Sequence, residues 1–126
     1  MIITNVQVRD TKTETRLEGV ASITFDDMIV IHDIKIISNA DGGFFLAMPS
    51  RRLPNGSFKD IAHPISKEAR GAIEALTISC FNYMRQSGHI GLVFTLKDGD
   101  KKTSMLQQTF SDFEVQNARE DLDIAL

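Results

Sequence analysis

The segment ASITFDDMIVIHDIKII, residues Ala21–Ile37, decides the fold of this chain. Its first part belongs to a run from Arg16 to Phe25 in which apolar and polar residues alternate, as in a strand with one buried face. Two aspartates then favour a tight turn, and Met28–Ile37 continues as a strand rich in isoleucine and valine. Two long strands joined by so short a turn predict an antiparallel sheet.

The second of these strands is apolar at both its odd and its even positions. The even positions predict one face of the strand: Met28, Val30, His32, Ile34 and Ile36. The odd positions Ile29, Ile31 and Ile37 lie on the other face. A strand that is apolar on both faces needs cover on both. We expect a helix on one face and a second copy of the chain on the other, which predicts a homodimer.

The neighbouring segments extend this pattern into an α+β fold. Ile2–Arg9 reads as the first strand and Phe44–Met48 as the fourth. A helix is expected from Ser66, a suitable N-cap, to a stop at Gly88. Its apolar stripe has three- and four-residue spacing and consists of Ala69, Ile73, Leu76, Cys80 and Met84. The sequence therefore predicts an antiparallel sheet of about four strands packed on one long helix.

The chain beyond the helix predicts a hairpin and a second helix. Ile90–Leu96 reads as a strand, with Thr103–Phe110 as its partner across an Asp-Gly turn. Ser111 and Glu114 have the spacing of a capping box and predict a last helix up to Leu126. We therefore expect a domain over residues 1–87 and a C-terminal hairpin/helix extension over residues 88–126, packed on the same domain.

Composition limits the class of protein. A chain of 126 residues predicts one domain that buries a core without disulfides. The single cysteine excludes an intrachain disulfide and fits a reducing compartment. No apolar run approaches the ~20 residues of a membrane span, so we expect a cytoplasmic protein without a membrane partner. A net charge of −3 argues against binding nucleic acid by bulk charge, although a local basic patch remains compatible with it.

Such a patch lies in the stretch FFLAMPSRRLPNGSFKDIAHPI, residues Phe44–Ile65. Two prolines and a Pro-Asn-Gly turn predict a shaped surface loop. Arginine presents a planar fork of donors that matches a phosphate, and the start of the following helix also favours an anion. The candidate nucleic-acid-binding residues are Arg51, Arg52, Lys59, Lys67 and Arg70. The alternative for the two arginines is a surface salt bridge to Asp60. Phe58 is a candidate for base stacking, or else a core residue.

The C-terminal end has the opposite charge. From Ser111 onward there is one basic residue, Arg119, against five acids: Asp112, Glu114, Glu120, Asp121 and Asp123. This asymmetry favours two surfaces with different partners. The alternative function is therefore a protein-interaction module that acts through the acidic C-terminal region, which would also cover or compete with the basic patch.

Catalytic and metal motifs are weak. Asp60 and His63 can form a general-base pair, which makes an enzyme a third interpretation, but no nucleophile elbow, HExxH motif or phosphate-binding glycine loop accompanies them. His32 and Asp33 are strand neighbours that point to opposite faces, which favours a structural role. Cys80 lies within the apolar stripe and is expected to be an inert buried thiol. We therefore expect no catalytic centre, metal site or cofactor.

Four segments in combination resemble a known family: Ala21–Phe25, Ile31–Ile34, Ala47–Arg52 and Asp60–Pro64. From residue 1 to about 85, the chain resembles the SpoVG proteins (stage V sporulation protein G, the septation regulators). The resemblance implies a small mixed fold, a homodimer, site-selective binding of DNA and RNA as a regulator, and no catalytic centre. It attributes nucleic-acid contact to basic residues around and after the main helix, whereas this chain has an acidic end.

Overall fold

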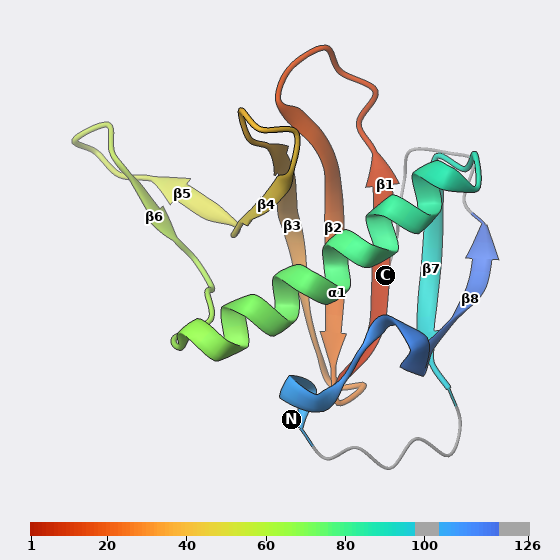
Figure 1. Ribbon diagram of the computed structural model, residues 1–126. Helices are drawn as coiled ribbons and strands as arrows, with labels where there is room; N and C mark the ends of the chain where they lie inside the picture. Colours follow the sequence, from red (N-terminus) through yellow and green to blue (C-terminus); the bar gives the residue numbers. More distant parts are fainter. Residues whose placement is uncertain (98–103, 119–126) are drawn as a thin grey trace.

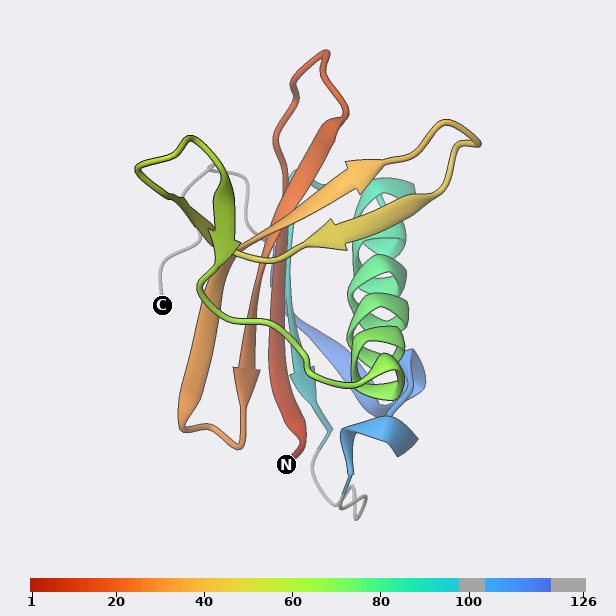
Figure 2. The same ribbon diagram turned by 90° about the vertical axis from the view of Figure 1, so that its left-hand side faces the viewer.

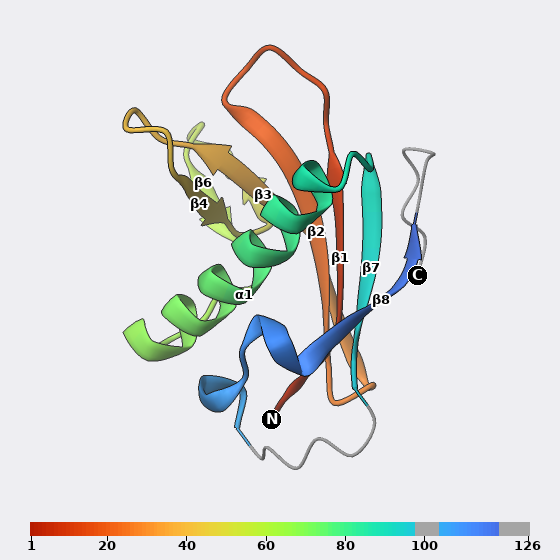
Figure 3. The ribbon, with the colours of Figure 1, turned by 45° about the vertical axis from the view of Figure 1, so that its right-hand side comes forward.

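The computed structural model of the protein describes residues 1–97 and 104–118. One α-helix lies across one face of an antiparallel sheet (Figures 1 and 3), so the predicted α+β class is confirmed. The described part of the sheet has six strands, in the order β4-β3-β2-β1-β7-β8, instead of about four. The strands of this sheet and the helix are β1 (Ile3–Asp10), β2 (Leu17–Phe25), β3 (Ile29–Ser38), β4 (Phe44–Ala47), α1 (Lys67–Gln86), β7 (Gly91–Leu96) and β8 (Phe113–Ala118).

Helix α1 begins and ends where its capping residues predict. Ser66 Oγ accepts a hydrogen bond from the backbone N–H of Ala69 at 3.1 Å, which satisfies one of the free donors of the first turn. Gly88 follows the last turn with φ +79°, a left-handed conformation that glycine adopts without a Cβ clash. These two caps set the ends of the helix, and the three- and four-residue spacing of its apolar residues places them on the side that faces the sheet.

The core lies between α1 and the sheet. Ile73, Leu76, Cys80 and Met84 of the predicted stripe are buried there, while Ala69 at the start of the helix is partly exposed. The helix approaches β2 closely at Gly19, where an added Cβ would clash with the ring of Phe81 and lie 2.7 Å from a backbone oxygen of β1. Glycine is therefore required for this packing.

The strand before the basic loop is only partly buried. Met48 and Leu46 belong to the core, and the ring of Phe44 makes an edge contact with that of Phe81, with centroids 5.5 Å apart. The adjacent Phe45 is 41% exposed. Adjacent strand residues point to opposite faces, so only one of two neighbouring phenylalanines can reach the helix side.

A bulge in β3 overturns the predicted faces of that strand. Ala21 of β2 pairs with Ile34 and Ile23 pairs with Ile31, so His32 and Asp33 together lie opposite the single residue Ser22. Asp33 has φ +61°, which fits the extra residue of a bulge. The bulge reverses the alternation, and the isoleucines on the helix side are Ile29, Ile31, Ile34 and Ile36.

The C-terminal part differs from the prediction. The expected strand Thr103–Phe110 is replaced, in its described part, by short 3-10 turns at Met105–Gln107 (η1) and Phe110–Asp112 (η2). The predicted helix from Ser111 is wrong up to residue 118, because Ser111 and Asp112 belong to η2, and β8 occupies the rest of this stretch and pairs with β7. Thr109 and Asp112, instead of Ser111 and Glu114, form the capping box. The predicted Asp-Gly turn and residues 119–126 lie outside the described residues.

Long-range hydrogen bonds explain why β8 joins the sheet. The side chain of Gln108 accepts from Ile3 N and donates to Ile3 O, both at 2.8 Å, although the two residues are 105 positions apart. These two buried hydrogen bonds connect the turns before β8 to β1. Phe113 at the start of β8 is then buried in the core.

Candidate nucleic-acid interface

The basic loop forms a small hairpin that projects from the sheet edge. Its strands are β5 (Ser50–Arg52) and β6 (Phe58–Asp60), and all six of their residues are exposed. Figures 1 and 2 show this hairpin extending beyond the β4 edge, away from the body of the molecule. We call residues 50–60 the arm.

The turn of the arm follows its sequence. Gly56 has φ +87° and donates its N–H to Leu53 O at 2.9 Å, and Asn55 Oδ1 accepts from Ser57 N at 3.0 Å. The Pro-Asn-Gly segment thus supplies both the left-handed residue and the side-chain acceptor that a tight turn needs. The segment is shaped and exposed, as expected, and it is a hairpin, which the sequence did not predict.

Two cations face each other across the arm. Arg51 pairs with Lys59, and Arg52 pairs with Phe58. Like charges directly opposite on an antiparallel pair repel, so this pairing costs stability unless an anion lies nearby. Among the described residues, neither Arg51, Arg52 nor Lys59 forms an ion pair, so the alternative of a salt bridge to Asp60 is wrong.

The two basic residues at the start of α1 differ from each other. Lys67 is exposed and belongs to the first turn, where backbone N–H groups also favour an anion. Arg70 lies 4.0 Å from Glu74 Oε2, and this carboxylate also accepts from Leu46 N at 3.1 Å. Arg70 is therefore partly neutralised within the protein. The helix start and the arm lie at the same end of the molecule (Figure 1).

Arg85, a basic residue that the sequence did not single out, has a structural role. Its guanidinium donates to Asp10 at 3.1 Å and to Glu18 at 2.9 Å. The same group lies over the ring of Phe81, 4.6 Å from its centroid. This contact holds the end of α1 on β1 and β2, so Arg85 is not free to bind a phosphate.

The catalytic alternative gains no geometric support. Asp60 and His63 form no hydrogen bond with each other, and His63 Nδ1 donates to Pro64 O at 3.0 Å. His32 Nδ1 instead lies 2.9 Å from Ser22 Oγ on the sheet face opposite the helix. Burial raises the pKa of the Cys80 thiol far above its usual value, which keeps it protonated and unreactive. Within residues 1–97 and 104–118, no group of His, Cys, Asp and Glu could hold a metal ion.

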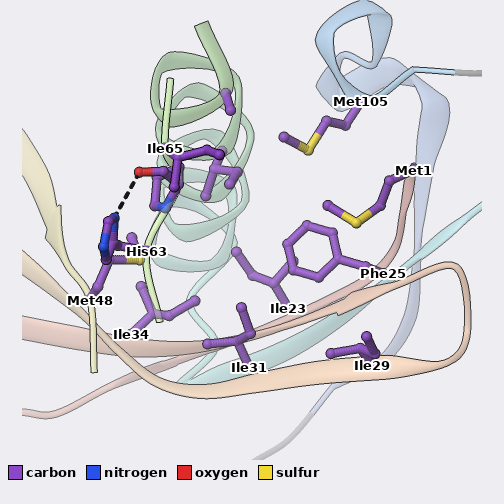
Figure 4. Close-up of a pocket in the computed structure, with 13 residues that line it drawn as sticks. Met1, Ile23, Phe25, Ile29, Ile31, Ile34, Met48, His63, Ile65 and Met105 are labelled. Atoms are coloured by element: carbon purple, nitrogen blue, oxygen red, sulfur yellow. Dashed lines mark hydrogen bonds between the residues drawn. The ribbon is translucent and has the colours of Figure 1, made fainter. Parts of the chain in front are cut away.

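An apolar groove lies beside the helix start. It has a volume of about 420 Å³, and its floor consists of β2 and β3 residues next to α1 (Figure 4). Ile65 and Ile29 on its rim are 93% and 63% exposed. The remaining residues of the groove are Met1, Ile23, Phe25, Ile31, Ile34, Met48, His63, Pro64, Ala69, Ile73 and Met105. The sequence did not reveal this groove, because the β3 bulge is what turns Ile29 and Ile31 toward it.

The arm and the helix start lie in a part of the chain that matches a known family. Residues 1–83 match the sequence model of the SpoVG family, which spans β1 to most of α1 and contains the whole arm. The chain belongs to the SpoVG family. Lys67 and Arg70 also lie within the part of the chain that matches the family.

Individual relatives carry the name "Putative septation protein SpoVG". The relative from Acholeplasma laidlawii is 48% identical over 81 residues, which are 64% of this chain and 85% of the relative. That from Finegoldia magna is 51% identical over 82 residues, 65% of this chain and 75% of the relative. That from Caldicellulosiruptor bescii is 43% identical over 88 residues, 70% of this chain and 99% of the relative. SpoVG-family similarity thus leaves about a third of this chain unmatched.

One finding concerns membranes. No helix in the described ranges is both long and apolar enough to cross a bilayer.

Proposed function

We propose that this protein is a regulatory protein that binds DNA or RNA, with the arm as its principal contact surface. The observation that carries the proposal is the exposed cross-strand pair of Arg51 and Lys59, two cations without an acidic partner among the described residues. Arg52 follows Arg51 in the same strand, β5. A nucleic-acid backbone supplies closely spaced phosphates that would neutralise this repulsion.

The proposal fits the overall acidity of the chain. With a net charge of −3, bulk attraction to a polyanion is absent, and contact depends on local geometry. The arm meets this requirement because it projects from the sheet (Figure 2), and Arg51, Arg52 and Lys59 form no ion pair among the described residues. Lys67 at the helix start extends the surface, whereas Arg70 contributes less because of Glu74.

A binding titration at about 50 and 200 mM salt tests the proposal, because each phosphate contact adds about 0.9 to the salt slope of log K. Arg51→Ala combined with Arg52→Ala is expected to weaken binding and to lower that slope by up to about 1.8. Folding stability should change by less than about 0.5 kcal/mol, since both side chains are exposed.

A matched control removes two exposed cations elsewhere. Lys12 and Arg16 lie in the connection between β1 and β2, away from the arm. Lys12→Ala with Arg16→Ala changes the net charge by the same amount and should leave the slope unchanged. An equal loss in both double variants would show that total charge, and not the arm, determines binding, and would contradict the proposal.

We also propose that the protein is a cytoplasmic homodimer. The apolar groove supports the dimer, because a monomer would leave Ile65, Ile29 and Met1 around it in water. A two-fold dimer would place the projecting rim of one copy in the groove of the other. The face of the sheet opposite the helix is a less suitable dimer interface, because the bulge places His32 and Lys35 there among apolar residues.

A further inference from the structure

Phe58 is an aromatic side chain that the fold leaves in water. It is 69% exposed, and its ring makes no aromatic contact among the described residues. Packing of the chain on itself therefore does not account for it, and the core alternative for this residue is wrong. Its position on a projecting hairpin makes the ring accessible to a ligand.

The backbone of the arm decides which side chains accompany Phe58. Leu53 N donates to Ser57 O and Ile61 N donates to Pro49 O, both at 2.7 Å. These bonds mark the hydrogen-bonded positions of the ladder, which alternate with non-bonded ones.

Arg52 and Phe58 therefore form a non-bonded pair, in which side chains lie closest. Alternation places this pair on one face of the hairpin and Arg51 with Lys59 on the other. One face thus offers an aromatic surface beside a guanidinium, and the other offers two cations.

We infer, resting on the proposed function, that the arm binds single-stranded nucleic acid by stacking an unpaired base on Phe58. Arg52 beside the ring binds the adjoining phosphate or extends the stacking surface. Arg51 and Lys59 attract the backbone of the same strand. Bases in a duplex are already stacked on their neighbours and cannot present a face to Phe58, so the duplex is the poorer ligand.

Tryptophan fluorescence gives a direct test, because the chain contains no tryptophan. Phe58→Trp introduces a single reporter at the proposed stacking position. Titration with a single-stranded DNA of about 16 nucleotides should quench its emission, and the same strand annealed to its complement should quench it much less. Phe45→Trp, at the exposed phenylalanine of β4, is the matched control and should respond to neither.

Affinity provides the second readout. Phe58→Ala should weaken single-strand binding on the order of 10-fold or more, and duplex binding by less than about 2-fold. Phe58→Tyr should retain wild-type affinity, since it keeps the ring. Equal losses for both DNA forms, an unchanged single-strand affinity, or a change in sedimentation that marks Phe58 as a protein contact would overturn the inference.

The arginine variants separate this inference from the proposed function. If Arg51→Ala with Arg52→Ala abolishes binding while Phe58→Ala has no effect, the arm binds nucleic acid but not by stacking. If the arginine variant binds normally, the proposed function itself fails.

Discussion

A single glycine determines how closely the helix approaches the sheet. Gly19 near the start of β2 faces Phe81 of α1, and the space between them admits no Cβ. In the sequence, Gly19 is only one member of an alternating run. The residue that leaves no room for a side chain there is Phe81, which lies 62 positions further along the chain. The alternation of apolar and polar residues predicts which face of β2 is buried. The distance between that face and α1 depends on the contact with Phe81.

Gly19→Ala is expected to destabilise the fold by about 1–3 kcal/mol, the usual cost of overpacking. The added methyl would meet both the Phe81 ring and a β1 backbone oxygen, and the backbone cannot move aside without breaking the sheet. Urea unfolding of the variant and of the wild type measures this difference.

Gly71→Ala is the matched control, because it makes the same change where a Cβ has room. Gly71 lies in the exposed part of α1, and nothing lies within 4 Å of an added Cβ. The substitution should raise stability by about 0.5–1 kcal/mol, because glycine is a poor helix residue. If both variants were destabilised equally, the close approach at Gly19 would not be the cause.

Local sequence patterns predicted most helices and strands. They failed where the structure of a segment depends on the strand with which it pairs. Alternation gave β2, and three- and four-residue spacing gave the buried face of α1, because each pattern reflects one element against one core. The bulge at Asp33 was missed, since a bulge depends on the register with β2. The stretch from Ser111 was read as a helix from its capping residues, whereas Gln108 and β7 make it a strand.

The candidate site was predicted in the same way. Proline, asparagine and glycine predicted an exposed, shaped loop, and the structure has a hairpin there. The pairing of Arg51 with Lys59 was not predictable without the register. The apolar groove was missed for the same reason as the bulge that creates its floor.

Truncation tests the role of the last strand. Deleting residues 111–126 removes β8 together with Phe113, which is 5% exposed. The deletion should lower the stability by about 3 kcal/mol or more, the typical cost of losing a buried phenylalanine. Thermal and urea unfolding measure it.

Deleting residues 119–126 alone is the companion variant. It removes three acids and one base while β8 stays intact. If the acidic end competes electrostatically with phosphates for the arm, this shorter deletion should raise the affinity for nucleic acid, most clearly at low salt. An unchanged affinity in the shorter deletion would show that the acidic end does not compete with nucleic acid for the arm.

The whole molecule separates its two charged regions. The arm follows β4 at one edge of the sheet, and β8 with Glu114 forms the other edge. The described acids of the C-terminal part therefore lie across the sheet from the arm and do not cover it. The molecule presents a basic projection at one edge and an apolar groove beside the helix start.

We expect the protein to be a homodimer in solution. Sedimentation at micromolar concentration should give twice the 14.0 kDa mass of one chain. Ile65→Asp should shift the population toward monomer, because a carboxylate on the rim of the groove cannot be buried without a large cost. The variant itself should fold normally, since Ile65 is 93% exposed in the monomer.

Ile61→Asp is the matched control. Ile61 is 66% exposed but does not line the groove, so its variant should remain dimeric. A wild-type protein that sediments as a clean monomer would remove the prediction, and dissociation by both variants would place the interface outside the groove.

The position of β1 has a consequence for synthesis. β1 is synthesised before β7, one of its two neighbours in the sheet, and before Gln108, whose side chain bonds the backbone of Ile3. At roughly 5–20 residues per second, several seconds pass between the emergence of β1 and that of β7 from the ribosome. During that interval the nascent chain has an unpaired strand edge beside β1, which can pair with other chains. Until β7 has been translated, the nascent chain therefore has an unpaired edge at which it can associate with other chains.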